Sequence, residues 1–137
     1  MTEVIQSRIK NTRELLETNK EAATVMTKGN ILAMTGGYAV DADSGTVVAD
    51  LLGVCNDSIS AADAETRVTY IKVSDEDTFI FATTNNSDAT HNGQAMVLTN
   101  ATTVNNTGTT SGTGIVQQVE PYGENTDKLI IGRFLTL

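Results

Sequence analysis

The sequence predicts a mainly β protein, in which a compact β-barrel or β-sandwich domain follows an N-terminal arm or a short helix. Short apolar runs of strand length recur along the chain, and Asn, Thr, Gly and Asp separate them. The last third shows this most clearly, with runs at Gln94 to Thr99, Gly114 to Val119 and Lys128 to Leu135. Aromatic residues make up only 4% of the chain, so the core is expected to consist mostly of Val, Ile, Leu and Ala.

The length of 137 residues is sufficient for one ordinary domain. Area scaling predicts a folded surface of about 7,000 Å² against about 21,000 Å² for the extended chain, so about two-thirds of the surface becomes buried. No stretch has the length and composition of an interdomain linker. We therefore expect two parts, an arm or helix over residues 1–26 and a single β-rich domain over residues 27–137.

The N-terminal segment has two possible conformations. Ile5, Ile9 and Leu16 are spaced by four and seven, which suits one face of a helix across Glu3 to Glu17. The same stretch also suits an extended arm that becomes ordered on a partner, because isolated helices of about 15 residues are marginal in water. Charged residues occur throughout, which predicts neither a signal peptide nor a membrane anchor and favours synthesis and folding in the cytoplasm.

The first half of the predicted domain contains short strands at close spacing. The expected strands are Thr24 to Met26, Ile31 to Thr35, Tyr38 to Val40, Thr46 to Ala49 and Leu51 to Cys55. Gly36-Gly37 and Asp41 to Gly45 are expected to form turns between them. Ser60 to Glu65 has room for a single helical turn.

The middle of the chain predicts a hairpin. Arg67 to Val73 and Thr78 to Thr83 flank the acidic turn Ser74 to Asp77, and both strands have apolar residues on both faces. Such strands are usually covered on both sides, either by a second sheet or by a neighbouring subunit. Thr99 to Gly114 is poor in charge and rich in Asn, Thr and Gly, so we expect a long flexible hairpin tip or surface loop there.

Few residues in this chain are suited to catalysis. His91 is the only histidine and lies in a predicted turn, where we expect a surface polar side chain. Cys55 ends an apolar run and is the only cysteine, so we expect a buried structural thiol. These residues do not form a set for acid-base, nucleophilic or metal chemistry, so we expect no enzymatic activity and no cofactor.

Three motifs resemble ligand sites only in part. Asp41 to Gly45 lacks the Gly and Glu positions of a calcium loop, and Asp75 to Asp77 is expected to be a solvated acidic turn. Gly108 to Gly114 lacks the Lys that a phosphate-binding loop supplies. No metal or phosphate site is therefore predicted.

Charge is distributed unevenly along the chain. Residues 1–30 carry a net charge of +1, which leaves −9 for the rest of a chain whose total is −8. An acidic body repels the phosphate backbone of nucleic acids, so nucleic-acid binding is not expected. The N-terminal segment therefore differs from the body in charge as well as in pattern.

The order of segments resembles that of the small capsid decoration, or cement, proteins of tailed bacteriophages. The strand entry Thr27 to Leu32, the Leu51-Leu52-Gly53-Val54 segment and the closing stretches Asn92 to Thr99, Gly114 to Val119 and Lys128 to Leu135 carry this resemblance. It covers most of the chain and concerns layout rather than a diagnostic motif. The N-terminal segment is longer and more charged than a simple arm of that family.

The resemblance implies a β-tulip-like domain that forms a homotrimer on the outer surface of a phage head and stabilises the capsid by bridging major capsid subunits. We expect the N-terminal segment to lie along the capsid and to add a strand to an exposed sheet edge. The residues expected to bind the capsid are Val4, Ile5, Arg8, Ile9, Lys10 and Arg13. The alternative interpretation is a head-fibre or tail-type module, or a carbohydrate-binding adhesion module, which would use Thr99 to Gly114 as its binding loop.

Overall fold

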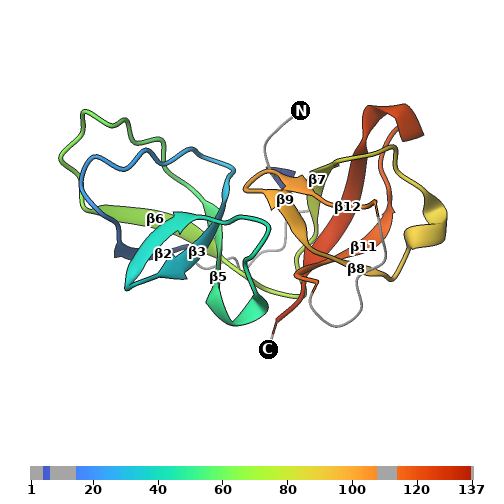
Figure 1. Cartoon of the computed structure of the whole chain (residues 1–137), viewed down its shortest axis with the longest axis horizontal. Coiled ribbons are helices and arrows are strands. Elements are labelled where there is room, and N and C mark those ends of the chain that lie inside the picture. Colours follow the sequence, from blue (N-terminus) through green and yellow to red (C-terminus); the bar gives the residue numbers. More distant parts are fainter. Residues whose placement is uncertain (1–4, 7–14, 108–113, 137) are drawn as a thin grey trace.

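The computed structural model describes residues 5–6, 15–107 and 114–136, and it consists of two β-sheets that lie side by side (Figure 1). We call the five-stranded sheet the barrel sheet and the seven-stranded one the large sheet. Within the described residues, the helical elements are three short 3-10 helices, Val48–Asp50 (η1), Ala89–His91 (η2) and Asn125–Asp127 (η3). The mainly β class predicted from the sequence is confirmed.

The barrel sheet is antiparallel and curls until its two edges approach each other. Its strands, in spatial order, are β2 (Leu15–Asn19), β6 (Arg67–Lys72), β5 (Leu51–Cys55), β3 (Ile31–Thr35) and β4 (Tyr38–Asp41). The edge strands β2 and β4 come close to each other without pairing, so the barrel is nearly closed. Gly36 and Gly37 have φ angles of 59° and 87°, and they form the predicted tight turn between β3 and β4.

The large sheet is built mainly from the second half of the chain. Its strands, in spatial order, are β8 (Ala95–Met96), β11 (Val116–Pro121), β12 (Leu129–Phe134), β7 (Phe79–Thr83), β10 (Thr103–Val104) and β9 (Leu98–Asn100). A seventh strand, β1 (Ile5–Gln6), pairs with β7. The pairing of β10 with β7 is parallel, and the other strand pairs of this sheet are antiparallel.

Strands β3 and β5 connect two hydrophobic cores. Because successive side chains of a strand point to opposite faces, Ile31 and Ala33 face the large sheet while Leu32 between them faces the barrel interior. On β5, Val54 likewise faces the large sheet and Cys55 faces the barrel interior. The strands that are apolar on both faces are thus covered on both sides within one chain, by the large sheet and by the barrel itself.

The predicted hairpin of Arg67 to Val73 with Thr78 to Thr83 is wrong. The first segment forms β6, which pairs with β2 and β5 in the barrel sheet, whereas the second forms β7 in the large sheet. Ser74 to Asp77 therefore connects two sheets instead of turning a hairpin. Val68 and Tyr70 of β6 are buried in the barrel core, whereas Phe79 and Phe81 of β7 are buried in the large-sheet core, so the two strands belong to different sheets.

Two further segments differ from expectation. Thr46 to Ala49 was expected to be a strand, but it leads into η1 and leaves Val47 exposed. Thr99 to Gly114 was expected to be a long flexible hairpin tip or a surface loop; of this stretch residues 108–113 lie outside the described structure, and the preceding part contains β10, which pairs with β9 and β7. Its Asn106 is buried and donates from Nδ2 to the carbonyl oxygens of Asn85 and Asn86 at 3.0 and 3.2 Å, so the amides bind backbone groups.

The described parts of the N-terminal segment are extended rather than helical. Ile5–Gln6 and Leu15–Asn19 are strands, so the helix across Glu3 to Glu17 does not form at either end. Leu16 packs against the barrel core, which accounts for its apolar character. Met26 forms a single bridge to Ile59, and Ser60 to Asp63 makes a turn closed by the Asp63 amide donating to the Ser60 carbonyl at 3.1 Å.

Candidate functional site

The residues expected to bind a partner lie almost entirely outside the described structure. Of the six, Ile5 is described, as part of β1. Those outside the described residues are Val4, Arg8, Ile9, Lys10 and Arg13. Strand β1 is therefore the described part of residues 1–14, and its contacts are those of Ile5 and Gln6.

Strand β1 occupies one edge of β7. Ile5 pairs with Ile80 and Gln6 with Phe79 in antiparallel register. Strand β12 pairs along Phe79 to Ala82 on the opposite edge, and β10 pairs with the end of β7 at Ala82 and Thr83. Since β7 is buried along its whole length, the backbone groups on this edge near Phe79 and Ile80 depend on β1 for partners.

The pairing of β1 with β7 covers two residues of each strand. Two paired residues provide one or two backbone hydrogen bonds, each with a net value of about 0.5–1.5 kcal/mol. Ordering the backbone costs about 1–2 kcal/mol per residue, which is of the same size. The backbone hydrogen bonds of β1 by themselves therefore contribute about as much as the ordering of its two residues costs.

The later part of the predicted arm belongs to the barrel. Strand β2 pairs with β6 over five residues, and Arg67 of β6 reaches across to its outer face. Arg67 Nε forms an ion pair with Glu17 Oε1 at 2.9 Å, and Nη1 donates to Asn19 Oδ1 at 2.6 Å. Of the segment 1–26, residues 15–26 are therefore built into the body, and a partner-binding arm must end before Leu15.

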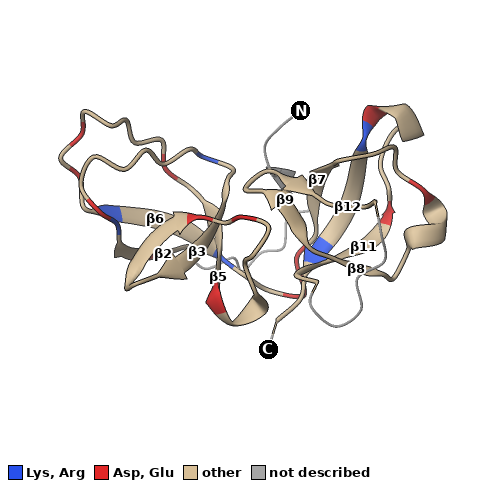
Figure 2. Ribbon diagram, viewed as in Figure 1, with Lys and Arg blue, Asp and Glu red and all other residues tan. Residues whose placement is uncertain are grey.

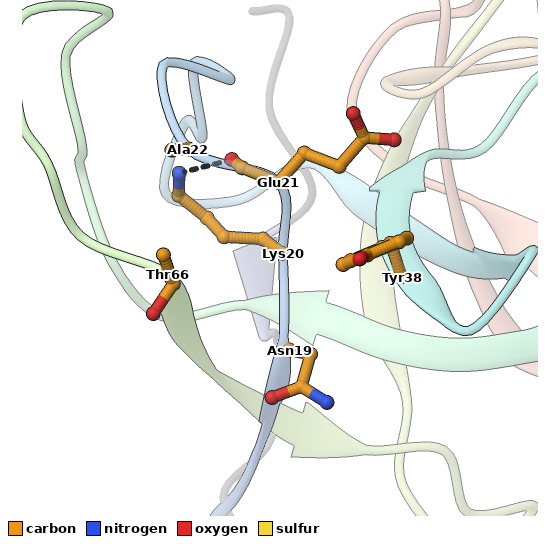
Figure 3. A pocket seen from close by; sticks show the side chains of 6 residues that line it. All are labelled: Asn19, Lys20, Glu21, Ala22, Tyr38 and Thr66. Carbon is orange, nitrogen blue, oxygen red and sulfur yellow. Dashed lines mark hydrogen bonds between the residues drawn. The ribbon is translucent and has the colours of Figure 1, made fainter.

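A polar hollow lies where the two edges of the barrel sheet approach each other (Figure 3). Its volume is about 540 Å³. Its lining residues are Asn19, Lys20, Glu21, Ala22, Tyr38 and Thr66. The Lys20 side chain is only 1% exposed, which makes it one of the largest fully buried side chains among the described residues.

The burial of Lys20 follows from strand alternation. On β2, Leu15, Glu17 and Asn19 are exposed, whereas Leu16 and Thr18 are half-buried. Lys20 continues the inward-facing series. Its backbone amide donates to the Thr66 carbonyl at 2.8 Å, which extends the backbone pairing beyond the end of β2. Sequence reasoning missed this residue because the segment suited a helix, and the four residues after Leu16 are all polar, so no apolar alternation in the sequence marks Lys20 as inward-facing.

Cys55 lies where the sequence predicted it, and His91 lies deeper than expected. The Cys55 thiol is buried, and Sγ donates to the Asp57 carbonyl at 3.2 Å. Burial raises the pKa of this thiol, with the hydrogen bond to Asp57 acting in the opposite direction. His91 ends η2 beside β11 and is half-buried, and its Nδ1 is buried without a hydrogen-bond partner. Cys55 thus lies in the barrel sheet, whereas His91 lies in η2 beside the large sheet.

The predicted acidic turns behave differently from each other. Asp43 Oδ1 accepts from the Gly45 amide at 2.9 Å, so this carboxylate organises its own turn. Asp77 is buried rather than solvated as predicted, and its Oδ1 has no hydrogen-bond partner. Among the described residues, no three His, Cys, Asp or Glu side chains gather as metal ligands would. Gly108 to Thr113 of the glycine-rich stretch lies outside those residues.

Acidic residues occur in the connections of both sheets (Figure 2).

Comparison with known proteins adds no assignment: no protein-family model matches this chain, and no curated protein matches it. In the part of the chain that the structure describes, no helix has the length and apolar character needed to cross a bilayer.

Proposed function

We propose that this chain is a structural virion protein that binds the outside of a phage head and stabilises the capsid by bridging major capsid subunits. The observation that carries the proposal is the N-terminal segment, which differs from the acidic body in charge and contacts a sheet edge through β1. Backbone pairing of this kind needs no particular partner sequence, so the edge of a capsid sheet is a suitable alternative acceptor. The resemblance in segment order agrees with this role.

Bridging depends on several attachments at once. A homotrimer would present three N-terminal segments, and their combined binding would compensate for the weak pairing of each one. The faces of β3 and β5 are already covered within the chain, so a trimer contact must use other surfaces. The large apolar side chains that remain exposed in the described structure are Leu15, Val25, Tyr38, Val47, Val119 and Tyr122.

The carbohydrate-binding alternative has less support. Sugar platforms usually need neighbouring exposed aromatic side chains. The three Phe and Tyr70 are buried, while Tyr38 and Tyr122 are exposed but belong to strands or connections of different sheets. The loop expected to bind sugars contains β10, whose Val104 is part of the large-sheet core.

The test is a deletion of residues 2–13, which removes the charged segment and β1 but keeps β2. We expect the deletion variant to fold, because the barrel strands remain, and to fail to co-sediment with heads assembled from the cognate major capsid protein. Circular dichroism and solution mass measurement check that fold and oligomer persist. Normal decoration of the heads by the folded variant would refute the proposal.

A charge-matched pair of variants tests the basic residues separately. Arg8→Glu with Lys10→Glu reverses two charges on the N-terminal segment, and Lys28→Glu with Lys128→Glu reverses two exposed charges on the body. We expect at least a tenfold loss of head binding in the first variant and little change in the second. Equal losses would indicate a general charge effect and contradict a specific role for the segment.

A further inference from the structure

Asn92 and Gly93 form a tight turn between η2 and β8. Asn92 has φ and ψ angles of −56° and 132°, and Gly93 has a φ of 85°. The turn is closed by the Gln94 amide, which donates to the His91 carbonyl at 3.0 Å. These values are those of a type II turn, whose third residue needs a positive φ and is therefore usually glycine. The turn thus accounts for Gly93, and it places a residue without a side chain directly after Asn92.

An asparagine followed by glycine can undergo a reaction that needs only water. The Gly93 nitrogen attacks Asn92 Cγ, a C–N bond forms, and the Cγ–Nδ2 bond breaks, so that the amide group leaves as ammonia with the proton of the Gly93 nitrogen. One water molecule then opens the five-membered imide at either carbonyl, which gives aspartate or isoaspartate at position 92. Isoaspartate routes the main chain through Cβ and lengthens the turn. Asn92-Gly93 is the one Asn-Gly dipeptide in the sequence.

The folded turn keeps the two reacting atoms apart. Closing the imide ring requires the Gly93 nitrogen and Asn92 Cβ to be nearly eclipsed about the Cα–C bond, and this arrangement lies outside both the α and the β regions of an L residue. The observed ψ of Asn92, 132°, lies in the β region. Rotation to the reactive geometry would therefore break the turn and the hydrogen bond that closes it.

Gln118 holds both residues of the turn in place. Its backbone carbonyl accepts from the Gly93 amide at 2.8 Å, and its side-chain Nε2 donates to Asn92 Oδ1 at 2.9 Å. Nε2 also donates to the Asp88 carbonyl at 2.8 Å, and because a carbonyl only accepts, this contact fixes which end of the amide faces the turn. Gln118 is fully buried, and its Oε1 has no hydrogen-bond partner in the described structure, so its side-chain hydrogen bonds are those made by Nε2.

We propose that Asn92 is a deamidation site, which the turn and Gln118 keep unreactive in the folded protein and which reacts when the edge formed by β8 and β11 opens. The hydrogen bond to Oδ1 polarises Cγ, but this has no effect while the Gly93 nitrogen is held away from that carbon. Strand β8 is an edge strand that pairs with β11 over two residues, so it can open without unfolding of the core. Deamidation therefore records local opening of the large sheet as an irreversible change of charge.

The test incubates the full chain at mildly alkaline pH and follows the conversion of Asn92 to an acid by peptide mass spectrometry. Gln118→Leu removes the Nε2 donor but keeps a side chain of similar size, and we expect it to deamidate about tenfold faster than the wild type. Val68→Ala weakens the barrel core and is the control, with an expected rate within about twofold of the wild type. Equal rates in the wild type and Gln118→Leu, or equal acceleration in both variants, would overturn the proposal.

A second measurement does not depend on the folding of Gln118→Leu. The wild type is incubated at one pH in native buffer and in concentrated urea, and Asn92 should deamidate at least about tenfold faster in the unfolded chain, where neither hydrogen bond to Gln118 persists. Hydrogen exchange of the native protein then locates the opening: the Gly93 amide should exchange faster than that of Phe81 in the buried strand β7. Equal deamidation in the two solvents, or equal exchange at Gly93 and Phe81, would overturn the proposal.

Discussion

The large sheet and the barrel sheet have cores of different character. The large-sheet core contains three Phe side chains in edge-to-face contact, with ring centroids of Phe79 and Phe81 both within 5.5 Å of that of Phe134. The barrel core has one aromatic residue, Tyr70, and it ends in a buried lysine beside a polar hollow. The difference indicates that the large-sheet core buries more apolar surface than the barrel core does.

The largest expected effect tests this division directly. Phe134→Ala should lower the free energy of unfolding by about 3–5 kcal/mol, because it leaves a cavity and removes both ring contacts. Val68→Ala, at an equally buried barrel position, should cost about 2 kcal/mol, from two lost methyl groups and a smaller cavity. Urea unfolding measures both values. A barrel variant as destabilised as the large-sheet variant would contradict the comparison.

The next effect concerns backbone packing inside the barrel. A Cβ atom on Gly53 would lie 1.9 Å from the carbonyl oxygen of Ile71, so β5 and β6 approach too closely for any side chain there. Gly53→Ala should cost about 1–3 kcal/mol in urea unfolding, as overpacking usually does. Gly45→Ala is the control, since its Cβ would be 3.4 Å from Asp43 Oδ1 and should have little effect. Comparable losses in the two variants would argue against this close approach.

Alkaline pH should lower the stability of the barrel core through ionisation of Cys55. Burial raises the thiol pKa above its ordinary value of 9.0, so the unfolded chain loses this proton at lower pH than the folded chain does. The stability contributed by the neutral thiol is complete below pH 9 and declines as pH rises through the folded pKa. Urea unfolding from pH 7 to 10.5 should show this decline in the wild type. Cys55→Ala should lack that component, and an identical pH profile would exclude the thiol as its source.

The smallest effect is expected on the exposed face of the barrel. The ion pair of Glu17 and Arg67 has side chains that are 53% and 43% exposed, so solvent screens it. Glu17→Gln should change the free energy of unfolding by less than about 1 kcal/mol, and the difference should shrink at high salt. A larger, salt-insensitive loss would mean that the barrel depends on this surface contact more than its exposure suggests.

The mainly β class and most of the strands follow from local patterns in the sequence. Ile31 to Thr35 and Leu51 to Cys55 are apolar on both faces, and a strand of this type must be covered twice, whatever supplies the cover. The Gly36-Gly37 turn and the buried Cys55 were also predictable, because glycine suits a positive φ and an apolar run continues to the thiol. These properties depend on neighbouring residues along the chain.

The pairing of the strands and the grouping of side chains depend instead on the three-dimensional fold. Ser74 to Asp77 suits a hairpin turn as well as a connection between two sheets, and the choice depends on the partners that β6 and β7 find elsewhere. Lys20 becomes buried because β2 joins the barrel and its alternation continues inward at that residue. Pairing and burial are set by contacts between residues far apart in the chain, and a local pattern of side chains does not specify those partners.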